Sequence, residues 1–491
     1  MTDRPIPFDN TYIRLPEKFY SQEIPTAVAA PKLIRSNPEL AEDLGIDPEW
    51  FASDDVVSVF SGNAVLDGSQ PIATVYAGHQ FGNWNPQLGD GRAIMLGEVI
   101  GKNGQRYDIQ LKGSGQTPFS RMGDGRSPLG PVIREYIVSE AMAALGIPTT
   151  RSLVAVVTGE PVVRESVLPG AILTRVARSH IRVGHFQYFS ARQDLEAVKA
   201  LADHVIERDF PEIGEANHPY IELLEKSISR QAQLIAQWQL VGFIHGVMNT
   251  DNMLICGDTI DYGPCAFMDE YHPNTCFSSI DHGKRYAYQN QPAIAQWNLS
   301  WLAQALLPLL DEDSSMAIEI AREKLNDFVD EYQLAYMEGL HRKFGLTVMT
   351  QESVKLAEDF LKLMTREAAD FTLTFRHLSD IAADSATQPP VDYQLPESFT
   401  DLLNQWKDLH GQEDGSQEEI QKRMYTVNPV YIPRNHLVED AIKAAQHNGD
   451  LRPFHRLVDT LADPFNHHPD NNDLTRPPEP HEVVLQTFCG T

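Results

Sequence analysis

The segment from His245 to Gly263, HGVMNTDNMLICGDTIDYG, restricts the possible folds of this chain more than any other stretch. Apolar residues at helical spacing precede it, so the segment is expected to leave the end of a long amphipathic helix. The dipeptide Gly257-Asp258 favours a tight turn, and the apolar residues on both sides of it are predicted to pair as a hairpin. Such a hairpin brings Asn252 and Asp261 together at its mouth.

The side chains of Asn252 and Asp261 predict a particular kind of site. An amide oxygen and a carboxylate are hard ligands that suit Mg²⁺ or Mn²⁺ carried by the phosphates of a nucleotide such as ATP. Each residue alone is equally typical of an ordinary surface turn. Their joint occurrence after a long helix favours a site for a nucleotide and a metal ion.

The same segment follows the spacing of the catalytic loop of protein kinases, H-R-D-x-x-x-x-N followed by D-F-G. Asn252 lies seven residues after His245, and Asp261-Tyr262-Gly263 stands where kinases have D-F-G. The position of the kinase base is Val247, and a valine cannot accept a proton. Either the chain is inactive or another carboxylate has taken the role, and the candidate is Asp251.

The order of the remaining patterns predicts the fold class. From about Ser58 to Leu111, apolar runs alternate with Gly and Asn turn signals, as in an antiparallel sheet. From Ser127 the pattern takes a helical period until Gly146, and the later part of the chain is mostly helical. We predict an α+β, protein-kinase-like bilobal fold. Residues 1–180 would form a small sheet-rich N-lobe with an N-terminal extension, and residues 181–491 a large helical C-lobe with a C-terminal tail.

A lysine at the end of a predicted strand indicates a contact with phosphates. The strand ending at Lys112 resembles the kinase strand whose lysine binds ATP and pairs with a glutamate of the next helix. That helix offers two glutamates. Glu140 shares its apolar face whereas Glu135 points elsewhere, so the pattern leaves the partner of Lys112 open.

Glycine and arginine supply further candidates for phosphate binding. The tetrapeptide Gly-Asp-Gly-Arg occurs at Gly89–Arg92 and again at Gly123–Arg126, where free backbone N–H groups could hold an anion. A plain hairpin turn explains a single copy equally well. Arg175, Arg178 and Arg182 form a second basic group that together suits a triphosphate.

Composition narrows the partners. A formal charge of -28, from 68 acidic and 40 basic residues, repels a phosphate backbone and argues against nucleic acid. No apolar stretch approaches the roughly 18 residues of a membrane span, and the first residues lack the pattern of an export signal. We therefore expect a cytoplasmic protein that acts without a membrane.

Several long strings of this sequence resemble the selenoprotein O, or YdiU, family of pseudokinases. The resemblance covers nearly the whole chain. It rests on YAGHQFG at 76–82, LGDGRA at 88–93, LKGSGQTPFSRMGDGRSPL at 111–129, HGVMNTDNM at 245–253 and RYAYQNQP at 285–292.

The resemblance implies a kinase-like fold that binds ATP in a flipped orientation and transfers AMP to Ser, Thr or Tyr side chains of proteins. Self-modification would be one readout of this activity. The resemblance makes Asp251 the proton acceptor, assigns the metal to Asn252 and Asp261, and prefers Glu135 as the partner of Lys112. Some members also use UTP. The residues that it assigns to the nucleotide are Gly89, Gly91, Arg92, Lys112, Asp124, Gly125, Arg175, Arg182 and Asp261.

The flipped orientation has a physical reason. Attack at the α-phosphorus expels pyrophosphate, so positive charge is needed beside the β- and γ-phosphates, and Lys112 with the two arginines can supply it. Two rival functions stay open. One is an inactive ATP-binding scaffold, and the other is an ordinary kinase that transfers the γ-phosphate.

The resemblance also concerns the four cysteines, which form no C-x-x-C pair. Eukaryotic members carry selenocysteine third from the end, where this chain has Cys489. This implies a reversible disulfide with a cysteine of the body, for which Cys276 is the candidate. The alternative is two free thiols in a reducing cytoplasm.

Overall fold

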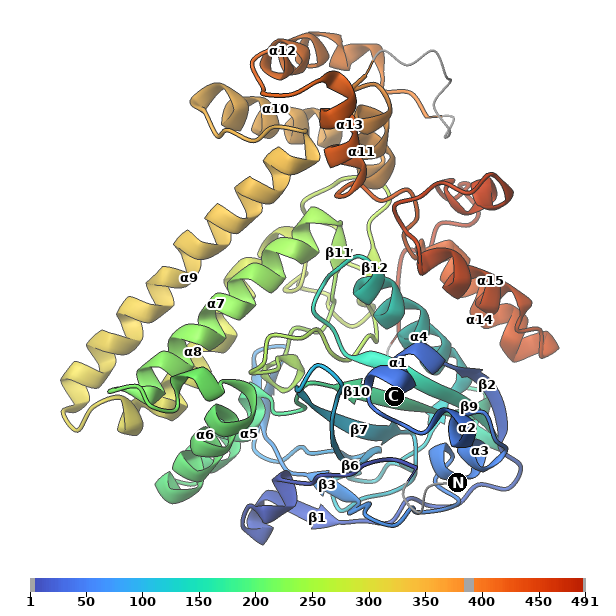
Figure 1. The fold of residues 1–491 in the computed structure, drawn as a ribbon, viewed down its shortest axis with the longest axis vertical. Coiled ribbons are helices and arrows are strands. Elements are labelled where there is room, and N and C mark those ends of the chain that lie inside the picture. Colours follow the sequence, from blue (N-terminus) through green and yellow to red (C-terminus); the bar gives the residue numbers. More distant parts are fainter. Residues whose placement is uncertain (1–4, 384–392, 489–491) are drawn as a thin grey trace.

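The computed structural model describes residues 5–383 and 393–488, and it is a mixed α/β protein built around one antiparallel sheet (Figure 1). The strand order is β1-β3-β6-β7-β10-β9-β2, and β8 pairs with β10. The bounds are β1 Tyr20–Gln22, β2 Lys32–Ser36, β3 Ile72–Thr74, β6 Ala93–Ile100, β7 Arg106–Lys112, β8 Ser127–Pro128, β9 Arg151–Val163 and β10 Val167–Ala177. The predicted antiparallel sheet is confirmed.

The two faces of this sheet are covered differently. One face packs against short N-terminal helices through a core that includes Leu44, Phe60 and Leu111. These helices are α1 Pro38–Asp43, α2 Pro48–Phe51 and α3 Asp55–Phe60. Two strands of the sheet, β1 and β2, precede the stretch predicted from about Ser58, and that stretch itself begins in a helix, because Val56, Val59 and Phe60 follow helical spacing and are buried on one side of α3.

The other face carries α4 (Leu129–Ala144), the helix predicted from Ser127 onward. Buried residues of α4 meet Ala171 and Leu173 of β10 in a core that also includes residues of α14 and α15. Figure 1 shows these two C-terminal helices beside α4. The end of the chain thus buttresses the helix of the sheet-rich part. Their bounds are α14 Asn435–Asn448 and α15 Arg452–Leu461.

Most of the remaining chain is helical, as predicted. The amphipathic helix before the His245 segment is α7 (Pro219–Leu240), which packs with α8 and α9 (Figure 1). Among the described residues, no helix is long and apolar enough to cross a membrane. The other helices are α5 Val183–Ser190, α6 Leu195–Asp209, α8 Gln291–Leu310, α9 Ser314–Lys343, α10 Gln351–Glu367, α11 Phe371–Asp380, α12 Thr400–His410 and α13 Gln417–Tyr425.

The hairpin predicted around Gly257-Asp258 is wrong. Leu254 forms an isolated bridge with Arg182, and Thr259 forms one with Thr149, so the two arms pair with other segments instead of with each other. The turn lies earlier, where the Gly257 N–H donates to the carbonyl of Leu254 at 3.2 Å. Neighbouring segments compete for the same backbone groups, and a local turn signal does not reveal them.

Candidate functional site

Asp261 lies at the centre of a cluster of five charged side chains, which we name the Asp261 cluster: Lys112, Glu135, Arg175, Arg182 and Asp261. Asp261 Oδ1 accepts from Lys112 Nζ at 2.8 Å and from Arg175 Nη1 at 2.7 Å. Its Oδ2 accepts from Arg182 Nη1 at 2.7 Å. Burial alone would raise the pKa of Asp261, but these three cations hold it well below its ordinary value. The carboxylate is therefore ionised.

The partner of Lys112 is Glu135. Lys112 Nζ lies 2.5 Å from Glu135 Oε2, and Arg175 Nη1 lies 3.2 Å from Oε1 of the same carboxylate. Glu140 accepts instead from Arg151 Nη2 at 2.7 Å and from the N–H of Ser152. Five residues of helix separate the two glutamates by about 140° around the axis, so they cannot serve the same neighbour.

The pairing of neighbouring strands brings the charged side chains of the cluster together. Lys112 and Arg175 lie on the adjacent strands β7 and β10, and Arg175 Nη2 also donates to Gln110 Oε1 of β7 at 2.6 Å. Asp261 has a φ of 64°, a left-handed backbone that costs free energy in any residue except glycine. The contacts with three cations compensate for this strain.

Asp251 lies beside the cluster, in the short 3₁₀ turn Thr250–Asn252 (η4). Arg182 Nη1 donates to the backbone carbonyl of Asp251 at 2.5 Å and so joins the turn to Asp261. Asp251 Oδ2 accepts from Gln80 Nε2 at 3.0 Å, whereas Oδ1 is buried without a hydrogen-bond partner among the described residues. Burial raises the pKa of the Asp251 carboxyl to about 6.

Asn252 and His245 hold this part of the chain in shape. Asn252 Nδ2 donates to the carbonyl of Val247 at 2.9 Å, so its amide oxygen is the end left for a ligand. The ring of His245 stacks on Trp238 and bonds to the carbonyl of Ile260 at 2.8 Å. This bond ties His245 to the residue before Asp261, whereas the predicted hairpin was to bring Asn252 and Asp261 together.

The glycine-rich tetrapeptides lie in two loops near the strand of Lys112, and both pack against the segment 115–120. The N–H of Gly113 donates to the carbonyl of Arg92 at 2.7 Å, which brings the first loop to the end of β7. In these loops a Cβ on Gly89 would lie 2.5 Å from the Phe119 ring, and one on Gly125 would lie 2.0 Å from the carbonyl of Gly115. A Cβ on Gly91 would lie 2.7 Å from the backbone carbonyl oxygen of Phe119.

Three arginines and an aspartate outside the Asp261 cluster differ in the partners of their side chains. Arg92 makes no side-chain hydrogen bond or ion pair with the residues that the structure describes, so it can reach a ligand. Asp124 is half exposed and pairs with Arg164 at 2.8 Å. Arg178, grouped with Arg175 and Arg182 from the sequence, instead pairs with Asp258 at 3.0 Å and is not part of the Asp261 cluster.

The structure thus joins Lys112, Glu135, Arg175, Arg182, Asp251 and Asp261 through direct hydrogen bonds, with Asn252 next to Asp251 in the chain. It connects Gly89, Gly91, Arg92, Asp124 and Gly125 to this network only through loop backbone and packing. Sequence reasoning missed Gln80, whose contact with Asp251 spans 171 residues of chain. The string YAGHQFG, which contains Gln80, was the available signal.

A divalent metal would have few protein ligands here. Within residues 5–383 and 393–488, no group of three or more His, Cys, Asp or Glu side chains could hold a metal ion. The free amide oxygen of Asn252 and the carboxylate of Asp261 fit Mg²⁺ or Mn²⁺ when phosphate oxygens and water complete the shell, as is usual for Mg²⁺ with a nucleotide. Asp261 would then exchange part of its contact with the three cations for the metal.

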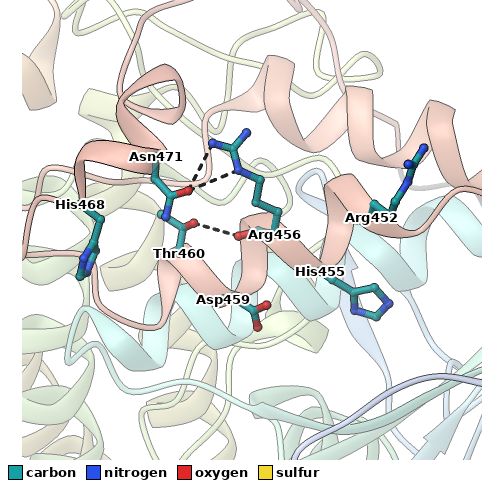
Figure 2. Close-up of a pocket in the computed structure, with 7 residues that line it drawn as sticks. All are labelled: Arg452, His455, Arg456, Asp459, Thr460, His468 and Asn471. Carbon is teal, nitrogen blue, oxygen red and sulfur yellow. Dashed lines mark hydrogen bonds between the residues drawn. The ribbon is translucent and has the colours of Figure 1, made fainter.

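A cavity of about 550 Å³ lies away from this site, on the C-terminal helix α15 and the turn Pro469–Leu474 (Figure 2). Its charged side chains already have partners, since Arg456 pairs with Asp473 and Arg452 with Asp450. We assign no function to it. Its lining residues are Arg452, His455, Arg456, Asp459, Thr460, His468 and Asn471.

The predicted disulfide involves Cys489, which lies outside the described residues. Cys276 is a free thiol within them. Thr487 forms a bridge with Ser278, so the described end of the tail lies beside the segment that carries Cys276. The pairing of Cys276 with Cys489 stays a prediction.

Comparison with known proteins identifies the family. The model of the family "Protein adenylyltransferase SelO" matches residues 5–462. A protein of Rhodopseudomonas palustris (strain BisB5) named protein nucleotidyltransferase YdiU is 56% identical over 487 residues, which cover 99% of each chain. Proteins of the same name from Methylorubrum populi and Rhizobium etli (strain ATCC 51251) are 55% and 54% identical over 99% of this chain and 99% and 97% of their own. The chain belongs to the SelO family of protein adenylyltransferases and is a nucleotidyltransferase.

Proposed function

We propose that this protein transfers AMP from ATP to Ser, Thr or Tyr hydroxyl groups of proteins, with Mg²⁺ or Mn²⁺ bound at Asn252 and Asp261. One observation carries the proposal. The buried carboxylate of Asp251, one oxygen of which has no partner within residues 5–383 and 393–488, lies next to an excess of positive charge, while the position of the kinase base is the buried side chain of Val247. The chain has a replacement base beside a site for phosphates.

The fold supports a kinase-like bilobal arrangement, with residues 1–180 as the N-lobe and 181–491 as the C-lobe. In protein kinases a strand lysine pairs with a glutamate of the adjacent helix, and a carboxylate of D-F-G approaches the same lysine. Lys112 pairs with Glu135 of α4, and Asp261 of the D-Y-G lies 2.8 Å from Lys112 Nζ. The same three roles are thus available in the same order along the chain.

The charge of the Asp261 cluster fits a nucleotide. Three cations face two carboxylates, so one positive charge is left over in a site where Asp261 keeps a fifth of its side chain exposed. A triphosphate would satisfy this excess. We propose that Gly89, Gly91, Arg92, Asp124 and Gly125 complete the nucleotide site from the adjoining loops.

The proposed reaction follows from this arrangement. The acceptor hydroxyl attacks the α-phosphorus, its proton passes to the carboxylate of Asp251, and the bond to the β-phosphate oxygen breaks to release pyrophosphate. Lys112, Arg175 and Arg182 stabilise the charge that develops on the pyrophosphate. A bound Mg²⁺ or Mn²⁺ would neutralise further phosphate charge. With a pKa of about 6, Asp251 is largely ionised at neutral pH and can accept the proton.

Labelled ATP tests this proposal. The purified protein is incubated with Mg²⁺ and ATP labelled at the α- or the γ-phosphate, alone and with an unfolded protein rich in Ser, Thr and Tyr. We expect covalent uptake of α-label only, abolished by EDTA and by Asp261→Ala and reduced about 10³-fold by Asp251→Ala. Arg452→Ala, at an exposed residue far along the chain, should leave uptake unchanged.

Other results would favour the rival functions. Uptake of γ-label would indicate a kinase. Binding of ATP without uptake of either label would indicate an ATP-binding scaffold. Parallel reactions with α-labelled UTP show whether UMP is also transferred. We also propose that the protein acts in the cytoplasm, on acceptor proteins of that compartment.

A further inference from the structure

A two-stranded hairpin outside the main sheet covers the turn that carries Asp251. It consists of β4 (Gly78–Gln80) and β5 (Asn83–Asn85), which pair in antiparallel register. The N–H of His79 donates to Thr250 Oγ1 at 2.7 Å, and the N–H of Phe81 donates to Asn249 Oδ1 at 3.0 Å. Backbone bonds on both sides of Gln80 thus attach the hairpin to the two residues before Asp251.

Gln80 and Gly78 enclose the carboxyl group between these attachments. Gln80 Nε2 donates to Asp251 Oδ2 at 3.0 Å. At Gly78, an added Cβ would lie 2.5 Å from Asp251 Oδ1 and 3.0 Å from its Cβ, so the backbone of the hairpin lies directly against the acid. The carboxyl group is confined by packing on one side and by one hydrogen bond on the other.

The hairpin is itself held from two distant parts of the chain. The hydroxyl group of Tyr286 donates to Asn249 Oδ1 at 2.7 Å and accepts from the N–H of Phe81 at 3.1 Å. The ring of His79 stacks on Trp301 with the ring centres 4.0 Å apart. The strings YAGHQFG and RYAYQNQP, about 200 residues apart in the sequence, therefore meet around the same turn.

We propose that Gln80 is a positioning residue for Asp251: it holds Oδ2 while the backbone of Gly78 packs against Oδ1, and it thereby fixes the orientation of the carboxyl group that accepts the proton. This inference rests on the proposed role of Asp251 as the proton acceptor. The two oxygens of a carboxylate are equivalent, and a donor on one of them fixes the orientation of the whole group. Gln80 therefore acts on the rate of transfer and leaves the binding of ATP to the Asp261 cluster.

Three variants separate the hydrogen bond from the packing. Gln80→Met keeps the length of the side chain but loses the donor, and Gln80→Ala loses both. Asn83→Ala is the matched control, because Asn83 pairs with Gln80 in the hairpin register and is exposed. We measure kcat and KM for ATP by uptake of α-label, together with Tm.

Both Gln80 variants are expected to lower kcat about 10- to 100-fold with KM for ATP within about 2-fold of the wild type, since a misplaced reacting group slows the chemical step. Asn83→Ala should match the wild type. Adding Gln80→Met to Asp251→Ala should cause no further loss, because the two residues act through one group.

Different failures have different meanings. If Gln80→Met keeps the kcat of the wild type while Asp251→Ala loses it, the inference about Gln80 is overturned and the proposed function stands. An additive loss in the double variant, or a raised KM for ATP with unchanged kcat, also overturns it. If the wild type transfers no α-label at all, the proposed function fails first and takes this inference with it.

Discussion

Two buried charge clusters lie between the sheet and the helices, and they differ in the sign of their excess charge. The Asp261 cluster sets three cations against two carboxylates. The second, which we name the Arg208 cluster, sets Arg208 of α6 against the carboxylates of Glu98, Asp108 and Asp209, with His180 bonded to Asp108 at 3.0 Å. One cluster lacks negative charge and the other lacks positive charge.

The two clusters also differ in how far their side chains are exposed to solvent. All members of the Arg208 cluster keep at most 5% of their side chains exposed, whereas Asp261 keeps 20% and Lys112 11%. Burial raises the pKa of Asp209 to about 6, so this acid lies close to taking up a proton. Protonation of Asp209 below its pKa of about 6 relieves part of the negative excess of the Arg208 cluster, whereas the Asp261 cluster can be balanced by an anionic ligand. The sign of the excess charge and its access to solvent thus distinguish a binding site from a structural network.

Removing the central cation of the Arg208 cluster should give the largest effect. Arg208→Met leaves three buried carboxylates without their cation, and breaking a buried pair in this way costs about 3–5 kcal/mol of the free energy of unfolding. Urea denaturation of the purified variant measures this loss. Arg452→Met, at a residue whose side chain is 90% exposed, is the matched control and should cost less than about 0.5 kcal/mol. Equal losses in the two variants would contradict the structural role of the cluster.

Removing a cation from the Asp261 cluster should affect function instead of folding. Lys112→Met still leaves Arg175 beside both carboxylates of the cluster and Arg182 beside Asp261, so the free energy of unfolding should fall by less than the loss of about 3–5 kcal/mol expected for Arg208→Met. Transfer of α-label should fall about 100-fold, because a cation that stabilises the leaving pyrophosphate is lost. Matched urea curves and kinetic assays on the same preparation check both parts. A loss of stability as large as that of Arg208→Met would remove the distinction between the clusters.

The sequence predicted those parts of the fold and of the site that depend on local pattern. The strand Arg106–Lys112 and the helix after Ser127 were predicted with nearly their observed bounds, because alternation and helical period are local. Asp251, Asn252 and Asp261 were predicted as site residues from their spacing in one short segment. Spacing did not decide between Glu135 and Glu140 as the partner of Lys112, because that choice depends on which strand packs against each side of α4.

Contacts between distant segments explain the remaining misses. Arg178 has the same residue type and spacing as Arg175 and Arg182, yet it turns to Asp258, 80 residues away. Gln80 has no local pattern that marks it, and its importance appears only when the hairpin lies on Asp251. The hairpin around Gly257 was wrong because Arg182 and Thr149 supply nearer partners. Local sequence records turn preference but not competition from the rest of the fold.

The smallest expected effect concerns the excess negative charge of the Arg208 cluster. The pKa of Asp209 is raised from 3.8 to about 6, so the folded state binds the proton more tightly than the unfolded state. The contribution of this group to the free energy of unfolding is therefore present below about pH 4 and is lost as the pH rises through about 6. Asp209→Asn removes the buried charge, and Asn Oδ1 can still accept from Arg208 Nε. We expect the variant to be about 1–2 kcal/mol more stable than the wild type at pH 8 and equal to it near pH 4.

The matched control is Asp108→Asn, which should change the free energy of unfolding in the opposite direction. Burial opposes the charge of Asp108, but Arg208 and His180 hold its pKa below the ordinary value, so its ionised form stabilises the fold at neutral pH. Asp108→Asn should therefore lower the free energy of unfolding at pH 8, where Asp209→Asn raises it. Urea denaturation of both variants between pH 4 and pH 8 measures the two trends. If Asp209→Asn is destabilising at pH 8, all three carboxylates are needed as anions, and the excess charge of this cluster is not relieved at Asp209.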